Sequence, residues 1–215
     1  MGSDTSTFAE LGMPFPLFEA RVADAEGFKL TGNCAMCGVR GVPIFEIVHK
    51  DRLVACYTCL RGGRASWMKD TEFGIVDAEH AAKGITHGTD SPPWPSLGYE
   101  VVPRTEDDEE WYSVRIAPEH LEELLRTPNY STWQGEQWQF CCHRPAIFVG
   151  SWDIDDWARA AAERRVEVVT LVGEVLDFRA DEAADLAEWV EADTVSTYVF
   201  RCSTCGRLRG HQDST

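Results

Sequence analysis

Three C-x-x-C pairs constrain the fold of this 215-residue chain more than any other feature. They are Cys34 with Cys37, Cys56 with Cys59, and Cys202 with Cys205. This spacing lets two thiolates from one tight turn converge on a single tetrahedral ion. The sequence therefore predicts metal-binding turns at three places along the chain.

The first two pairs together read C-x2-C-x18-C-x2-C, a spacing that is typical of a structural zinc site. Gly38 and Gly41 follow the first pair, and Gly62 and Gly63 follow the second, where such turns often need positive φ. Four thiolates saturate Zn²⁺ and leave no position for water, so we expect a structural centre. The competing interpretation is a thioredoxin-like redox motif, but that motif normally stands alone near a βαβ pattern.

The third pair, Cys202 and Cys205, needs two further ligands, and the segment 141-CCH-143 supplies the candidates. In an extended strand Cys141 and His143 point to one face, whereas Cys142 points to the other. In a turn, Cys141 and Cys142 both reach the same ion. A third interpretation has no metal here, only a buried free cysteine and a surface histidine. We predict a second zinc, and the residues alone leave its ligand pair open.

Charge limits the classes of partner. The chain carries 20 Lys and Arg against 36 Asp and Glu, a formal net charge of −16. This balance argues against nonspecific binding to nucleic acid and against binding to an anionic membrane surface. It suits a basic protein partner. No stretch approaches the ~20 apolar residues of a membrane span, and the N-terminus lacks the pattern of a secretory signal. We therefore expect a cytoplasmic protein, in which cysteines are more often metal ligands than disulfides.

The order of turn signals and periodic segments predicts an α+β fold. We expect a small zinc-ribbon or knuckle module over residues 1–85, then an acidic, proline-rich insertion over 86–116 whose run Glu106 to Glu110 lies in an exposed loop. Residues 117–215 should form a mixed α/β part that the second zinc cluster closes; the alternative is one compact domain overall. Strands are expected at 43–48, 53–56, 166–172 and 196–201, and helices should begin at Pro118, Asp153 and Asp181.

Several longer segments follow one another in a recognisable order. They are C-x-x-C-G at 34–38, 56-CYTCLRGGRA-65, 126-RTPNYSTWQGEQWQFCC-142, 148-FVG-150 and 198-YVFRCSTCGRLRGH-211. In this order they resemble the CbrC family, poorly characterised bacterial cysteine-rich proteins named for one that is linked to colicin tolerance. The resemblance runs in register from about Met13 to His211. Its most specific part is 126–142, with Trp133, Trp138 and two ligand positions three and four residues after the second tryptophan.

This resemblance implies which residues complete the second centre. The family usually has His-Cys where this chain has Cys141-Cys142, and both side chains bind zinc, which implies that position 141 is a ligand. The implied sets are Cys141, Cys142, Cys202 and Cys205 for the second zinc, with His143 as the alternative ligand, beside Cys34, Cys37, Cys56 and Cys59 for the first. The segment 86–116 is longer than in the family, so no role transfers to it. The resemblance also implies an association with toxin tolerance and no defined reaction.

Catalytic signals are sparse. The sequence contains no G-x-S-x-G, no H-E-x-x-H and no phosphate-binding loop. Glu136 is either a polar residue on an otherwise buried aromatic turn or an acceptor beside the second metal.

Three functional classes remain: a structural-zinc adaptor that binds a basic protein in toxin tolerance or a stress response, an enzyme with an open position at the second zinc, and a zinc-ribbon nucleic-acid module. The net charge counts against the third class. We expect two Zn²⁺ per chain and a protein-binding function, with the metal-dependent enzyme as the alternative.

Overall fold

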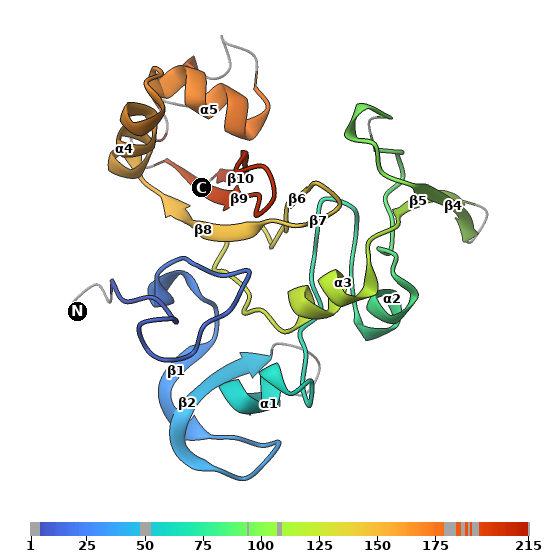
Figure 1. Cartoon of the computed structure of the whole chain (residues 1–215), viewed down its shortest axis with the longest axis vertical. Helices are drawn as coiled ribbons and strands as arrows, with labels where there is room; N and C mark the ends of the chain where they lie inside the picture. The colour runs from blue at the N-terminus through green and yellow to red at the C-terminus, as the bar shows by residue number, and fades with distance from the viewer. Residues whose placement is uncertain are drawn as a thin grey trace.

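The computed structural model describes residues 5–47, 53–93, 95–106, 109–178, 184–185, 188, 190 and 194–214. The strands are β1 (Phe28–Asn33), β2 (Arg40–Ile47), β3 (Leu53–Cys56), β4 (Val101–Glu106), β5 (Glu109–Val114), β6 (Phe140–Cys141), β7 (Arg144–Pro145), β8 (Ile147–Trp152), β9 (Val195–Arg201) and β10 (Leu208–Ser214). The helices are η1 (Val22–Asp24), α1 (Tyr57–Arg61), α2 (Ala78–Lys83), η2 (Pro95–Leu97), α3 (Pro118–Leu125), α4 (Ile154–Arg164) and α5 (Val168–Leu176), where η marks a 3-10 helix. The expected α+β class is confirmed (Figure 1). The helix expected from Asp181 falls largely outside the described residues.

The first sheet has the order β1-β2-β3 and is antiparallel throughout. Phe28 of β1 pairs with Phe45 of β2, and their ring centroids lie 5.1 Å apart. The short helix α1 begins directly after β3, at Tyr57. Figure 1 shows β1, β2 and α1 together at the lower end of the molecule. This arrangement places the turn between β1 and β2 beside the start of α1.

The second sheet has the order β10-β9-β8, and α4 and α5 accompany it at the upper end of the molecule (Figure 1). Helix α4 begins after Asp153, as expected. The Asp153 carboxylate accepts the backbone N–H of Asp156, and the Asp156 carboxylate accepts the backbone N–H of Asp153, which satisfies two free donors at the helix start. Trp157 is fully buried, and its indole N–H donates to the Thr197 hydroxyl of β9 at 3.0 Å.

The strand expected at 166–172 is wrong, because most of this run belongs to helix α5. Its many valines favoured a strand. The apolar side chains, however, recur at helical spacing: Val168, Leu171, Val172, Val175 and Leu176. This face packs on β10, where a Cβ added to Gly210 would lie 2.9 Å from the Leu176 side chain. Burial of one helical face against the sheet therefore outweighs the β-propensity of the single residues.

The segment 86–116 is more ordered than the exposed loop expected from its prolines and charges. Strands β4 and β5 pair along their full length, and Val114 and Ile116 are buried in the core. The acidic run lies at the tip of this hairpin, where Glu106 pairs with Glu109 in the ladder. Glu109 and Glu110 are exposed, and residues 107–108 lie outside the described residues. Figure 1 shows the hairpin projecting at the right of the molecule.

The larger hydrophobic cluster draws side chains from both sheets. It contains Phe8 and Phe45 as well as Phe148 and Phe200. The N-terminal segment also pairs with β8: the Glu19 N–H donates to the Phe148 carbonyl, and the Phe148 N–H donates to the Leu17 carbonyl, both at 2.9 Å. Residues 17–19 are therefore hydrogen-bonded to the second sheet.

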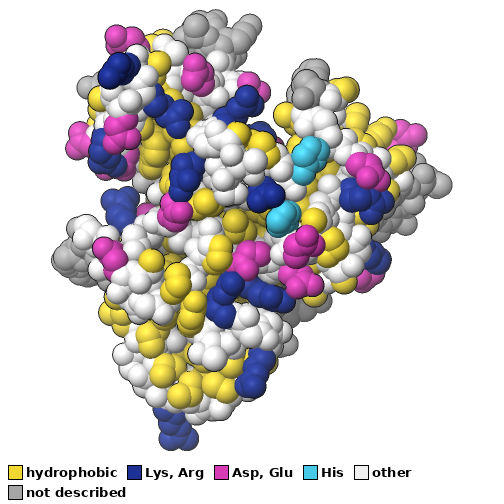
Figure 2. Space-filling view, viewed as in Figure 1, with side chains coloured by type: hydrophobic (Ala, Val, Ile, Leu, Met, Phe, Trp, Pro, Cys, Tyr) yellow, Lys and Arg dark blue, Asp and Glu magenta, His cyan; other side chains and the backbone are white. Residues whose placement is uncertain are grey.

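Charged side chains of both signs share the surface. On the face that Figure 2 shows, Lys and Arg lie interspersed with Asp and Glu. Several basic groups are paired, among them Arg61 with Glu123 at 2.5 Å and Arg209 with Glu72 at 2.9 Å. Among the described residues, no helix combines the length and the apolar composition needed to cross a membrane.

Candidate metal centres

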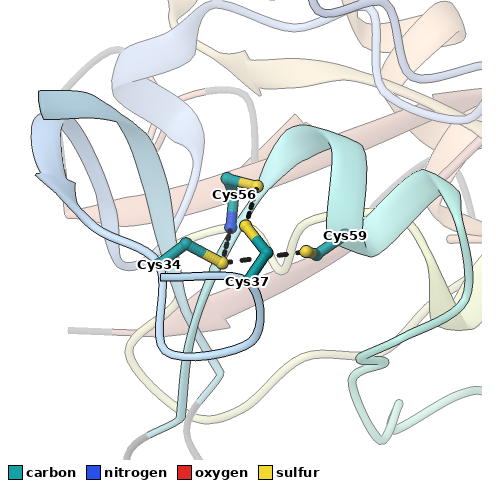
Figure 3. Close-up of side chains that lie close together, drawn as sticks. All are labelled: Cys34, Cys37, Cys56 and Cys59. Carbon is teal, nitrogen blue, oxygen red and sulfur yellow. Dashed lines mark hydrogen bonds between the residues drawn. The ribbon is translucent and has the colours of Figure 1, made fainter. Parts of the chain in front are cut away.

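The first candidate centre lies where the first sheet meets α1. Cys34 and Cys37 belong to the turn between β1 and β2, Cys56 ends β3, and Cys59 lies in α1. Figure 3 shows the four side chains converging. The Sγ atoms of Cys34 and Cys59 are 3.8 Å apart, as are those of Cys37 and Cys56. All four sulfurs lie within 4.8 Å of one another.

The turn that carries Cys34 and Cys37 is held by its own backbone. The Cys34 N–H donates to the Val39 carbonyl, and the Gly38 N–H donates to the Cys34 carbonyl, both at 2.9 Å. Gly38 has φ +74°, and no atom lies within 4 Å of the position of a Cβ there. Glycine is therefore required for the backbone conformation and not for space, as the sequence predicted.

The electrostatics of this group favour a cation among the sulfurs. Burial opposes ionisation of Cys34, but the backbone N–H groups of Cys56, Cys37 and Met36 outweigh it and lower the pKa of Cys34 to about 6. Burial and the neighbouring sulfurs raise the pKa of Cys59 to about 12. Without a metal, therefore, the Cys34 thiolate forms readily, whereas ionisation of Cys59 beside it is opposed. A divalent cation is the group that stabilises four thiolates together.

The second candidate centre repeats the turn of the first. The Cys202 N–H donates to the Arg207 carbonyl at 2.9 Å, and the Gly206 N–H donates to the Cys202 carbonyl at 3.0 Å. Gly206 has φ +71°, close to the value at Gly38. Cys202 and Cys205 lie in the turn between β9 and β10, so each three-stranded sheet presents one such turn at the end of a hairpin.

The remaining sulfurs of this centre come from the turn between β6 and β7. Cys142 and His143 form this turn, with φ +51° and +60°. The turn brings Cys141 and Cys142 to the same side, with their Sγ atoms 3.9 Å apart and Cys141 Sγ 3.6 Å from Cys205 Sγ. Cys141, Cys142, Cys202 and Cys205 all lie within 4.8 Å of one another. His143 is not in this group; its ring contacts Tyr99, with centroids 4.9 Å apart.

The second group shows the same electrostatic pattern. Burial opposes ionisation of Cys202, but the backbone N–H groups of Cys205 and Thr204 lower its pKa to about 6. Burial and the sulfurs of Cys202 and Cys205 raise the pKa of Cys141. Each group therefore contains one cysteine whose pKa is lowered, Cys34 or Cys202, and one whose pKa is raised, Cys59 or Cys141.

The geometry of both groups fits zinc. A tetrahedral ion with Zn–S bonds of about 2.3 Å separates its sulfur ligands by about 3.8 Å. The four Sγ–Sγ distances given above span 3.6–3.9 Å, far longer than a disulfide bond, and all eight cysteines are free thiols. The centres differ in their surroundings. At the first, Cys37 alone is exposed, whereas Cys142 and Cys205 are both exposed and line a pocket of about 540 Å³.

Glu136 pairs with Lys69 and is not among the residues of the second cysteine group. Its carboxylate accepts a hydrogen bond from the Lys69 ammonium at 3.1 Å, and its side chain is 7% exposed. Trp138 is fully buried and Trp133 is 75% exposed, so the aromatic turn that was expected to be buried is buried on one side only.

Sequence reasoning missed two buried polar groups. Lys69 stands alone in the sequence, and no motif indicates that its ammonium is buried. His211 is only the last residue of the segment 198–211 in the sequence, yet its Nε2 lies 2.6 Å from the Tyr130 hydroxyl, 81 positions away in the chain. Only the burial of Lys69 among Trp67 and Trp138 reveals the first group, and only the tertiary fold reveals the second.

Two knuckle turns on two antiparallel sheets, each completed by a second cysteine pair, define a protein with two four-cysteine centres. The chain belongs to an uncharacterised protein family, UPF0167, whose sequence profile matches residues 15–214. No curated protein and no solved structure matches the chain significantly.

Proposed function

We propose that this chain binds two Zn²⁺ ions and that both ions are structural. One observation carries this proposal: each group offers four cysteine sulfurs at the separations of a tetrahedral ion. Four thiolates fill the coordination sphere of Zn²⁺, as in structural sites and unlike catalytic ones, which keep one position for water. The eight ligands are those of the two groups, and His143 is not among them.

Elemental analysis tests the metal content directly. Protein purified without added metal should contain about two zinc ions per chain by mass spectrometry. A single zinc would show that one of the two groups is not a metal centre. Protein with no metal, and with cysteines oxidised to disulfides, would contradict the proposal altogether.

The protein as a whole acts, in this proposal, by binding a basic partner protein in the cytoplasm, in toxin tolerance or a stress response. The net charge of −16 supports a basic partner, because complementary charge speeds capture. The resemblance to the CbrC family supports the tolerance role. A pull-down from the native host, with partners identified by mass spectrometry, should enrich proteins of high isoelectric point, and Cys56→Ser should lose them.

A second candidate function is a metal-dependent enzyme at the second centre. The pocket that Cys142 and Cys205 line favours it, because small molecules reach these sulfurs from solvent. Cobalt substitution distinguishes the two functions. A spectrum typical of four thiolates supports the structural role, and a spectrum with three thiolates and one oxygen ligand supports the enzyme.

A further inference from the structure

A pocket of about 410 Å³ lies apart from the residues of both cysteine groups. Its lining includes three carboxylates, from Glu26, Asp70 and Glu136, together with the amide of Asn129. Glu26 and Asp70 are exposed, whereas Glu136 lies deep in the wall. The pocket therefore collects negative charge from three separate parts of the chain.

One positive charge beside this pocket is already engaged. Lys69 is fully buried, and its ammonium donates to the Asn129 side chain at 2.5 Å and to Glu136 at 3.1 Å. It also lies 4.8 Å from the ring centroid of Trp138. Burial raises the pKa of Glu136 to about 7, although Lys69 opposes that rise. One ammonium thus faces three carboxylates, and a further cation in the pocket would stabilise their ionised forms.

The spacing of these carboxylates suits an organic cation better than a metal ion. Among the described residues, only the two cysteine groups bring three ligand atoms within 4.8 Å of one another, so these carboxylates do not converge in that way. Mg²⁺ and Ca²⁺ need oxygen ligands at about 2.0–2.6 Å around one point. A guanidinium or ammonium group on a flexible chain places no such demand on the carboxylates.

An exposed tryptophan lies on the segment that forms the rim of this pocket. Residues 131–136 include the pocket-lining Ser131, Thr132, Gly135 and Glu136, and Trp133 lies among them with 75% of its surface exposed. Trp133 is the most exposed of the large hydrophobic side chains in the described part of the chain. A large aromatic side chain contributes strongly to binding when a partner covers it, and Trp is among the residues most enriched at interface hot spots.

The backbone of this rim is fixed. The N–H groups of Trp133 and Gln134 donate to one oxygen of the buried Asp213 carboxylate, at 2.9 and 3.0 Å. The Ser131 N–H donates to the Asp24 carbonyl at 2.9 Å. The indole is therefore presented on a preorganised segment, which lowers the entropy lost when a partner binds.

We propose that Trp133 and the pocket formed with Glu26, Asp70 and Glu136 are the docking surface for an arginine- and lysine-rich segment of a partner protein. The carboxylates receive the basic side chains, and the indole covers their aliphatic stems or guanidinium faces. This inference rests on the proposed function, because it locates the surface that a basic partner would use.

The test uses the full zinc-loaded chain and a fluorescein-labelled hexa-arginine peptide as the probe. Fluorescence anisotropy at about 0.15 M ionic strength gives Kd, and a salt series follows the electrostatic part. Trp133→Ala should raise Kd at least tenfold, as removal of a hot-spot residue does. Glu26→Gln with Asp70→Asn should also raise Kd, and the effect should shrink as salt increases.

Matched controls separate a defined surface from general attraction by a negative protein. Glu119→Gln with Glu163→Gln removes the same charge at two exposed positions, on α3 and α4. Leu30→Ala removes another exposed hydrophobic side chain, on β1, which is 59% exposed. Both controls should bind the peptide within about twofold of the wild type, because none of these three residues belongs to the pocket lining or to the rim segment 131–136.

The indole N–H resonance of Trp133 gives an independent measurement. It is assigned by its absence in Trp133→Phe and should shift on addition of hexa-arginine. If the two double variants weaken peptide binding equally, or if Trp133→Ala leaves Kd unchanged, the proposed docking surface is wrong. Neither result contradicts the proposed function. If spermine displaces the peptide at the peptide's own concentration, the pocket binds small cations and the proposed protein segment is wrong. A pull-down without basic partners contradicts the proposed function whatever the peptide does.

Discussion

Cys142 and His143 both adopt left-handed backbone angles, which side-chain-bearing residues usually avoid. A two-residue hairpin turn of this type normally has Asn-Gly or Gly-Gly. Each such residue costs on the order of 1 kcal/mol, and this cost persists where the surrounding structure requires the conformation. At position 142 the conformation is needed because it brings the Cys142 sulfur to 3.9 Å from that of Cys141. At position 143 the imidazole ring contacts the Tyr99 ring and is not among the clustered sulfur ligands.

These two neighbours should therefore respond differently to substitution. Cys142→Ala should weaken the second centre, because only three thiolates remain there, and one of the two zinc ions should be lost on dialysis against a chelator that leaves both ions in the wild type. His143→Gly should keep both ions and change the free energy of unfolding by no more than about 1 kcal/mol, since relief of backbone strain offsets the lost ring contact. Elemental analysis and urea denaturation measure both effects. Loss of one zinc in His143→Gly would make the histidine a ligand.

At the scale of elements, strand β10 places a histidine in an aromatic stack. The register pairs His211 with Tyr198 of β9, and the two rings stack with centroids 4.9 Å apart. The Tyr130 hydroxyl lies 2.6 Å from His211 Nε2. Burial lowers the pKa of His211 to about 4, although Asp213 opposes this shift. The folded protein therefore keeps this imidazole neutral where an unfolded chain would protonate it.

This lowered pKa predicts a loss of stability in acid. The unfolded histidine has a pKa of about 6.5, so between that value and about 4 the unfolded state binds the extra proton. Stability then falls as pH falls through this window, by up to about 3 kcal/mol from this group alone. Urea denaturation at pH 7 and pH 5, with excess zinc, should show a smaller pH effect in His211→Gln than in the wild type. Equal pH dependence would show that His211 does not carry it.

The elements differ in how far the sequence could predict them. Helix α4 was predictable from Asp153, because a capping carboxylate acts on its own neighbours. Both cysteine turns were predictable because Gly38 and Gly206 stand at a fixed offset from their cysteines. Helix α5 was not predictable. Its valine-rich run favours a strand, and burial of one helical face against β10 outweighs that preference only in the folded protein. The pairing of Lys69 with Glu136 was also beyond the sequence, because 67 positions separate them.

At the scale of the whole molecule, the first cysteine group is part of the core and not an appendage. Cys34, Cys56 and Cys59 belong to the same hydrophobic cluster as Phe148 and Phe200 of the second sheet. Residues 17–19 pair with β8, and Arg201 of β9 bonds Glu19 at 2.5 Å. Loss of the first centre therefore disturbs side chains that the second sheet also needs.

Thermal unfolding should therefore be a single transition whose temperature depends on both centres. Structural zinc contributes an apparent binding free energy of about 10–16 kcal/mol in zinc-finger peptides, whereas whole domains are stable by only about 5–15 kcal/mol. Cys56→Ser at the first centre and Cys205→Ser at the second should thus each lower the temperature of the same calorimetric transition, because the two sheets share core residues. Near-UV circular dichroism should lose its signal at that temperature, since the buried Trp138 and Trp157 lie in different clusters and report on both. Two separate transitions, of which each variant moves only one, would instead show that residues 1–85 and 117–215 fold as independent modules.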